Sequence, residues 1–209
     1  INGWINDELT KQYADNGLIR VAPTENCFRE CGNVKRPINS MADMTGLKIR
    51  VPETQACQDF YTALGAIPAA IATSETLAAL EQGTVDGVDN SIYNMKSMGV
   101  LEKIKYITML NYMYSGASIT CSEEFWNSMT ANQQAAFKQA ADEAGAFFRE
   151  NMRADEQTIL DQGSFEVEEI DPSSDFYKQM KEKAVELWAG YASEYPSDIM
   201  DRINQDFSV

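Results

Sequence analysis

The sequence predicts an α/β fold built around a mainly parallel sheet. Between residues 47 and 90, short apolar segments alternate with helix-like runs, and glycine or proline stands at most of the boundaries. This alternation is typical of strand–helix–strand units. A second observation is a helical pattern of unusual length, from Thr130 to about Gln162. Globular helices usually run about 8 to 20 residues, so we expect this one to cross between two lobes.

The expected helices begin and end at recognisable signals. Gly17 follows the first helix as a C′ glycine. Ser74 is expected to cap the helix that follows it, and Thr130 with Gln133 forms a capping box. The expected helices are 6–16, 40–43, 55–64, 74–82, 130–162, 175–193 and 198–207.

The expected strands are short apolar runs with turn residues at their ends. The segment 47–51 reads as a buried strand that stops at Pro52. Pro68 interrupts the segment 66–71, which predicts a distorted strand or an edge strand. Residues 164–170 alternate apolar and acidic side chains, as an edge strand would. The other expected strands are 18–23, 28–34, 85–89, 106–111 and 117–121.

The composition is typical of a folded globular protein, and its negative charge makes nucleic-acid binding unexpected. The 209 residues suffice for one large domain or two small ones, and 44% are hydrophobic. The formal net charge is -15. Nucleic-acid binding needs a basic face, so no nucleic-acid partner is expected. No apolar run approaches the roughly 18 residues of a membrane-spanning helix, so we do not expect the chain to be membrane-embedded.

The sequence offers no recognisable catalytic or cofactor motif. It contains no histidine, so neither a Ser-His nor a Cys-His pair can be built. There is no phosphate-binding P-loop, no dinucleotide fingerprint and no zinc pattern. We therefore expect no enzymatic activity, no cofactor and no metal site.

Four cysteines, Cys27, Cys31, Cys57 and Cys121, permit disulfides in an oxidising compartment. Four residues of extended chain span about 13 Å, which is too far for a bridge between Cys27 and Cys31. These two could pair only if the chain bends between them.

Arg50 is the most informative single residue. It stands among Leu47, Ile49 and Val51 in an apolar strand. A buried guanidinium needs a partner, which is either a structural carboxylate or an anionic ligand. Asn90 ends a later strand, and ligands of open α/β sheets bind beyond the carboxyl ends of the strands. The planar fork of arginine matches a carboxylate. Arg50 is therefore expected either to form a structural salt bridge or to bind the carboxylate of a ligand.

Two long segments around Arg50 carry a family resemblance. GLKIRVPE begins at Gly46, and SETLAALEQGTVDGVDN runs from Ser74 to Asn90. In this order they resemble the signature of the DctP-type solute-binding proteins of tripartite ATP-independent periplasmic (TRAP) transporters. The similarity runs from about Gly17 to Gln162 and more loosely to the C-terminus. It implies a two-lobe periplasmic-binding-protein fold (class II-like), with mixed sheets flanked by helices and lobes that close by hinge bending.

The resemblance also implies a domain organisation. In that family a complete α/β segment precedes the part that resembles the first residues here, so we expect the chain to lack its N-terminal portion. Residues 1–27 would be the remainder of the N-terminal lobe, and 28–115 a second α/β lobe with the ligand-binding motifs. Residues 116–160 would return across the lobes as a strand and the long helix, and 161–209 would form the C-terminal strand and helices.

The site residues follow from the same resemblance. Arg50 would grip the carboxylate of the ligand, and the side-chain amide of Asn90 would hydrogen-bond it. Arg29, in CFREC, would make a second contact to the anionic group, with an ordinary surface arginine as the alternative. Cys27, two residues before Arg29, stands where the family commonly has glycine. The backbone near Arg29 is therefore expected to differ from that of the family.

The remaining candidates line the expected cleft. Thr73 stands where many relatives carry an aromatic residue, and a threonine would leave the pocket larger or more polar. Glu53 and Thr54 follow the Arg50 strand, and Tyr93 lies one turn into the next helix. Each of these has a purely structural reading as its alternative. Asp89 replaces the usual glutamate of the family and is expected to be a helix-start carboxylate.

The expected function is that of a periplasmic receptor in secondary transport. It would bind a small organic anion, a carboxylate or a sulfonate, and deliver it to the membrane permease subunits of a TRAP transporter. The alternative is a periplasmic sensing module of the same fold, which reports its ligand to a signalling partner and transports nothing.

Overall fold

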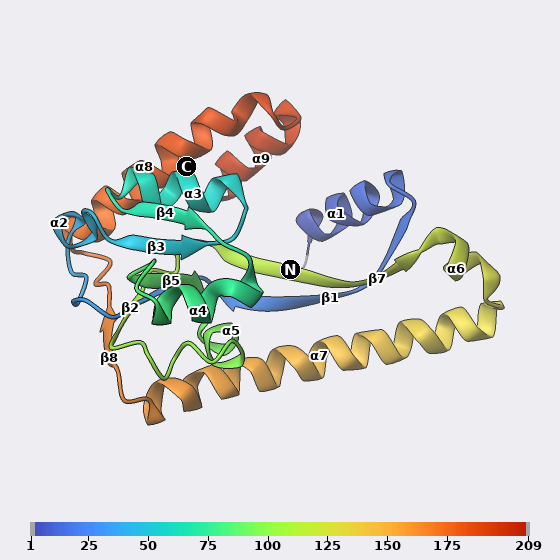
Figure 1. The fold of residues 1–209 in the computed structure, drawn as a ribbon. Coiled ribbons are helices and arrows are strands. Elements are labelled where there is room, and N and C mark those ends of the chain that lie inside the picture. The colour runs from blue at the N-terminus through green and yellow to red at the C-terminus, as the bar shows by residue number, and fades with distance from the viewer. Residues whose placement is uncertain (1–2, 208–209) are drawn as a thin grey trace. The chain divides into compact units, whose positions relative to one another are not determined.

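The structure is a computed structural model, and it describes residues 3–207. Figure 1 shows the helices and strands along the chain. Contacts divide the chain into two units. The first contains the chain up to Arg29, Ser91–Asn94 and Asn111–Gly163. The second contains Glu30–Asn90, Met95–Leu110 and the chain from Ser164 onward.

The first unit is built on a two-stranded antiparallel ribbon. Strands β1 (Leu18–Phe28) and β7 (Tyr114–Ser122) pair along their length, with irregularities between Arg20 and Ala22 and between Glu25 and Phe28. Helices α1 (Trp4–Asp15) and α7 (Ala131–Gln162) contact β1 and lie on opposite sides of the ribbon (Figure 1). Helix α6 (Glu123–Ser128) joins β7 to α7.

Helix α7 confirms the prediction of one unusually long helix. It has 32 residues, and Thr130 and Gln133 form the expected capping box. The small core of this unit contains Val21, Ala22 and Ala141, all almost fully buried. Ala141 brings α7 against β1 because its short side chain lets the helix approach the strand.

The second unit contains a six-stranded sheet with the order β4-β3-β5-β2-β6-β8. Its strands are β2 (Glu30–Asn33), β3 (Lys48–Val51), β4 (Ile67–Ala70), β5 (Gly87–Asn90), β6 (Tyr106–Met109) and β8 (Glu166–Glu169). The pairs β3–β4, β3–β5 and β6–β8 are parallel. Strand β2 runs antiparallel to both β5 and β6. The sheet is therefore mixed, as the family resemblance implied, and three of its five strand pairs are parallel.

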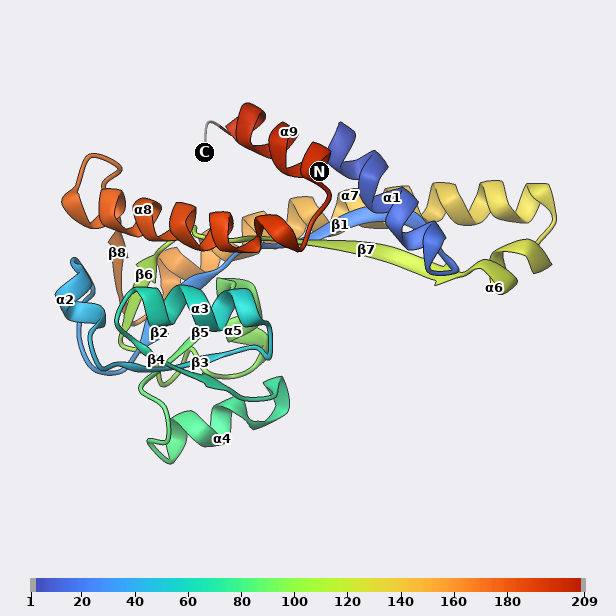
Figure 2. The ribbon, with the colours of Figure 1, turned by 90° about the horizontal axis from the view of Figure 1, so that it is seen from above.

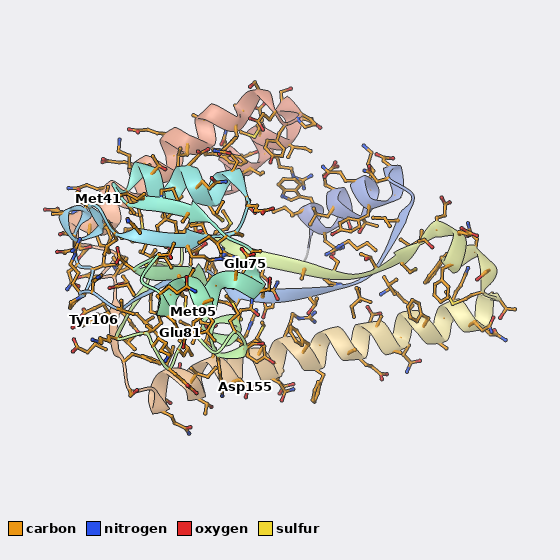
Figure 3. The ribbon with its side chains drawn as sticks, in the orientation of Figure 1. Met41, Glu75, Glu81, Met95, Tyr106 and Asp155 are labelled. Carbon is orange, nitrogen blue, oxygen red and sulfur yellow. The ribbon has the colours of Figure 1, made fainter. Side chains whose placement is uncertain are left out.

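Helices α3 (Gln55–Ala63) and α4 (Thr76–Glu81) pack directly on this sheet, where α3 contacts β3 and β4, and α4 contacts β5. Helix α8 (Asp175–Gly190) contacts α3 and α2 (Met41–Met44), and α9 (Ser197–Phe207) follows it. The residues of α5 (Ile92–Ser97) are divided between the two units. Figure 2 shows α3 and α4 on opposite sides of the sheet. The core between these layers includes Ile49, Val88 and Met95, each 0% exposed, and Figure 3 labels Met95. Gly87 allows β5 to approach β2, because a Cβ there would lie 2.5 Å from the Gly32 carbonyl oxygen.

Most of the expected elements are present, and three differ in an informative way. Strand β1 continues to Phe28 instead of ending at residue 23. The strand expected at 117–121 pairs with β1 and does not join the larger sheet. Ser74 does not cap a helix, because a short 3-10 turn, η1 (Thr73–Glu75), precedes α4. The two strands predicted to lie at sheet edges, β4 and β8, do so.

None of the four cysteines forms a disulfide. Cys27 belongs to the first unit and Cys31 to the second. Across residues 3–207, no helix has both the length and the apolar character needed to span a bilayer.

Candidate functional site

Arg50 is held in a defined position near the end of β3. Its side chain belongs to the core, with 2% of the residue exposed. Nε donates to the carbonyl oxygen of Ile71 at 2.8 Å, and Nη2 donates to Oγ1 of Thr73 at 3.3 Å. Both acceptors lie in the segment that follows β4, so two bonds fix the plane of the guanidinium.

Asn90 lies on the same face of the sheet as Arg50. Arg50 is opposite Val88 on the parallel strand β5, and Asn90 follows two residues later. Side chains two residues apart on a strand point to the same face. Asn90 is 9% exposed, and its Nδ2 donates to Sδ of Met98 at 3.3 Å. This register places Arg50 and Asn90 on one face of the sheet, near the carboxyl ends of two neighbouring parallel strands.

Glu30 on β2 is a further buried charged residue, which the sequence motifs did not single out. Glu30 is directly opposite Asn90 across the β2–β5 pair and is 0% exposed. Arg50, Asn90 and Glu30 therefore occupy neighbouring positions on one sheet face, all of them buried. The signal for Glu30 was available, since a single acid inside a predicted strand is as unusual as the arginine at position 50.

Asp89 requires a correction. It was expected to be a helix-start carboxylate, but it lies within β5 and is 0% exposed. Its partner across the ladder is Cys31, which is also fully buried. Burial is the main cause that raises the pKa of the Cys31 thiol to about 12, so this thiol stays protonated at neutral pH.

Three other candidates lie in turns near the end of β3 or β4 and are exposed. Thr73 is the first residue of η1 and accepts the hydrogen bond from Arg50. Glu75, labelled in Figure 3, is exposed in the same turn. Glu53 and Thr54 connect β3 to α3, and Thr54 is the N-cap residue of α3 without a side-chain capping bond.

Arg29 and Tyr93 belong to the first unit. Arg29 directly follows β1 in sequence and is half-buried, and its backbone N–H donates to the carbonyl oxygen of Met113 at 3.0 Å. The half-buried ring of Tyr93 packs edge-on against Phe148 of α7, with ring centroids 6.4 Å apart. The structure thus joins Arg50 to Thr73 by a direct bond and to Asn90 by a shared sheet face, all within the second unit.

The comparison with known protein families identifies the chain. Residues 2–194 match the model of the bacterial extracellular solute-binding proteins, family 7 (DctP). The C4-dicarboxylate-binding periplasmic protein DctP of Rhodobacter capsulatus is 28% identical over 166 residues, which are 78% of this chain and 50% of that protein. The 2,3-diketo-L-gulonate-binding periplasmic protein YiaO of Escherichia coli is 27% identical over 161 residues, 77% of this chain and 49% of that protein.

Solved structures show the same fold. A TRAP periplasmic solute-binding protein from Ochrobactrum anthropi is 28% identical with a TM-score of 0.84, over 96% of this chain and 63% of that one. In that protein the C-terminus is bound in the ligand-binding pocket. The chain described here spans about half the length of the curated relatives it matches.

These matches confirm the predicted α/β periplasmic-binding-protein fold with its long helix. They also confirm the predicted periplasmic location and place the chain in a family of binding proteins, not of enzymes. The chain belongs to family 7 of the bacterial extracellular solute-binding proteins, the DctP family of TRAP transporter receptors.

Proposed function

We propose that this protein binds a small organic acid and that Arg50 holds the acid group. The observation that carries the proposal is the geometry of Arg50, a buried guanidinium oriented by Ile71 and Thr73 near the end of a parallel strand. Burial lowers the local dielectric, so a fixed cation there attracts an anion more strongly than an exposed one does. A fork of N–H donors also selects the planar geometry of a carboxylate.

The neighbouring residues would orient the rest of the ligand. The side-chain amide of Asn90 can both donate and accept a hydrogen bond, which suits a hydroxyl or keto group beside the carboxylate. Thr73 would keep Arg50 in place and present a small polar surface. Glu53 and Thr54 would line the region beyond β3. For Arg29 and Tyr93 the family resemblance alone supports a contact with the ligand, as a second cation and a phenolic hydroxyl.

The names of two relatives support a carboxylate ligand. One binds C4-dicarboxylates and one binds 2,3-diketo-L-gulonate. We infer a ligand of the same broad class, a dicarboxylate, a keto acid or a sugar acid. Threonine at position 73 favours a ligand with a polar group near the guanidinium, because an aromatic side chain there would have supplied an apolar wall.

We further propose that the protein delivers its ligand to the membrane permease subunits of a TRAP transporter. The family assignment supports this role. The alternative, a sensor that reports the ligand to a signalling partner, would use the same binding residues. Uptake of the labelled ligand by cells that carry the gene, but not by cells that lack it, would support transport over sensing.

A ligand screen and one substitution test the binding proposal. The purified protein is heated with succinate, D-glucuronate or pantoate, and the melting temperature is recorded. A ligand at 100 times its dissociation constant stabilises the folded state by about 2.7 kcal/mol, so a true ligand gives a clear rise. The acid with the largest effect is then titrated by calorimetry.

We expect Arg50→Ala to weaken binding strongly. Removing one partner of a buried charge pair costs about 2–5 kcal/mol, which corresponds to roughly 30-fold to a few thousand-fold in affinity. Arg50→Lys should also bind poorly, because an ammonium group cannot reproduce the fork. The matched control is Lys48→Ala, which removes an exposed cation from the same strand. Equal losses in the Arg50 and Lys48 variants would show that only net charge matters and would refute the site.

A further inference from the structure

Helix α7 contacts one face of β1 at successive turns. Ala141 packs with Val21 and Ala22. One turn later Gly145 lies against the strand, since a Cβ there would be 2.7 Å from the carbonyl oxygen of Pro23. The same oxygen accepts a hydrogen bond from Nη1 of Arg149 at 2.6 Å. Residues from two successive turns of α7 therefore meet the same backbone oxygen of β1.

One turn beyond Arg149, the contact between α7 and β1 is an ion pair. Glu25 is 0% exposed and meets Arg153 of α7 in a two-pronged ion pair. Nε of Arg153 lies 2.6 Å from Oε1 of Glu25, and Nη2 lies 2.8 Å from Oε2. The hydroxyl of Tyr114, on β7, donates to Oε2 of Glu25 at 2.5 Å. One buried carboxylate thus ties together a helix and both strands of the ribbon.

The electrostatics agree with an ionised carboxylate. The hydrogen bond from Arg153 is the main cause that lowers the pKa of Glu25. Burial first, and the bond to Glu25 second, raise the pKa of Tyr114 to about 12, so the phenol keeps its proton. We call Glu25, Arg153 and Tyr114 the carboxylate clamp.

The clamp lies where the β1–β7 ladder becomes irregular. The register shifts between Glu25 and Phe28, and Cys27 adopts a φ of 56° in between. Such a bulge leaves backbone groups without regular ladder bonds, so other contacts must fix its shape. Beyond the bulge, the ring of Phe28 packs edge-on against Tyr114 with centroids 5.4 Å apart. The next amide, that of Arg29, donates to Met113 at 3.0 Å.

We propose that the carboxylate clamp consists of positioning residues for Arg29. Tyr114 is adjacent to Met113, which accepts from the Arg29 amide, and Tyr114 is itself held by Glu25 and Arg153. The clamp therefore fixes both chains of the ribbon immediately before Arg29 begins. This proposal rests on the proposed function in one respect, namely that Arg29 contacts the anionic ligand.

The first test measures the position of Arg29 without any ligand. Amide hydrogen exchange is followed by NMR in the wild-type protein and in the variants Tyr114→Phe and Arg153→Gln. A hydrogen bond to a charged group contributes enough that its loss should speed exchange at Arg29 by about tenfold to a hundredfold. Amides of residues 18–20, in the other end of the ladder, should exchange as in the wild type.

Two controls accompany this test. Tyr13→Phe removes a hydroxyl that makes no hydrogen bond within residues 3–207, and Lys138→Ala breaks an exposed ion pair with Asp142 on the same helix. Neither should change exchange at Arg29. Unchanged exchange at Arg29 in both clamp variants would overturn the proposal. So would an equal rise at residues 18–20, because that pattern indicates general destabilisation.

The second test asks whether the clamp acts through Arg29. Affinity for the acid selected from succinate, D-glucuronate and pantoate is measured by calorimetry in a double-mutant cycle of Tyr114→Phe and Arg29→Ala. We expect Tyr114→Phe to weaken binding about three- to tenfold when Arg29 is present and to have no further effect in the Arg29→Ala protein. Equal losses in both backgrounds would overturn the proposal. If none of the three acids binds, the proposed function is in doubt, and the exchange experiment alone decides on the clamp.

Discussion

At the scale of single residues, two tyrosines donate their hydroxyl groups to carboxylates. Tyr114 donates its hydroxyl to buried Glu25, and Tyr191 donates to Asp59 of α3. Burial first, and the bond to Glu25 second, raise the pKa of Tyr114 to about 12, and the bond to Asp59 is the main cause that raises the pKa of Tyr191 to about 12. An unfolded tyrosine titrates near pH 10. The folded protein therefore binds these protons more tightly than the unfolded chain does.

We expect stability to fall at alkaline pH because of these two groups. A raised pKa gives a contribution that is complete below about pH 10 and is lost as the pH rises toward 12. Melting temperatures between pH 8 and 11.5 should therefore decline less steeply in Tyr114→Phe and in Tyr191→Phe than in the wild type. Tyr13→Phe is the control and should follow the wild-type curve. If the melting temperature declined equally with pH in all four proteins, Tyr114 and Tyr191 would not be the cause of the alkaline loss of stability.

At the scale of secondary-structure elements, local signals predicted most of the helices. The capping box at Thr130 located the start of α7, and the glycine at position 17 located the end of α1. Ser74 failed as a capping signal because η1 occupies the place where the helix was expected to start. A 3-10 turn and the first turn of an α-helix differ by one residue in their hydrogen bonds, a difference that this sequence pattern does not encode.

Strand pairing was less predictable, because it depends on contacts between distant segments. The antiparallel direction of β2 follows from its position between β5 and β6, and nothing within Glu30–Asn33 specifies either neighbour. The carboxylate clamp shows the same limit. Glu25 lies 89 residues from Tyr114 and 128 residues from Arg153. Arg50 and Asn90 were easier to recognise, since their motifs are continuous in sequence.

The contact between α7 and β1 gives a prediction for Gly145. Alanine is favoured over glycine within helices by about 1 kcal/mol. A Cβ at position 145 would nevertheless lie 2.7 Å from the backbone oxygen of Pro23, and overpacking typically costs about 1–3 kcal/mol. Gly145→Ala should therefore lower the free energy of unfolding measured in urea.

Gly190 provides the matched control. It ends α8 with helical backbone angles, φ -63° and ψ -33°, and no atom lies within 4 Å of an added Cβ. Gly190→Ala should raise the free energy of unfolding by about 0.5–1 kcal/mol. If both substitutions stabilised the protein, the close approach of α7 to β1 would be refuted.

At the scale of the whole molecule, the charge of the protein opposes its proposed ligand. The chain has 32 acidic and 17 basic residues and a formal net charge of -15. An anion in solution is repelled by this charge at long range. Exposed charges are screened beyond about 8 Å at physiological ionic strength, whereas the contact with Arg50 is buried and screened much less. Global and local electrostatics therefore act on different steps of binding.

This separation predicts an unusual response to salt. The association rate of the organic acid should rise modestly between about 10 and 150 mM salt, because screening weakens the long-range repulsion. The dissociation rate should change little, since it depends mainly on the buried contacts. Stopped-flow fluorescence of the 3 tryptophans can follow both rates, with sucrose at matched osmolality as the control for solvent effects. A steep fall in the association rate with salt would instead reveal a positively charged path to Arg50, and the local cations would then govern the approach of the ligand as well as its retention.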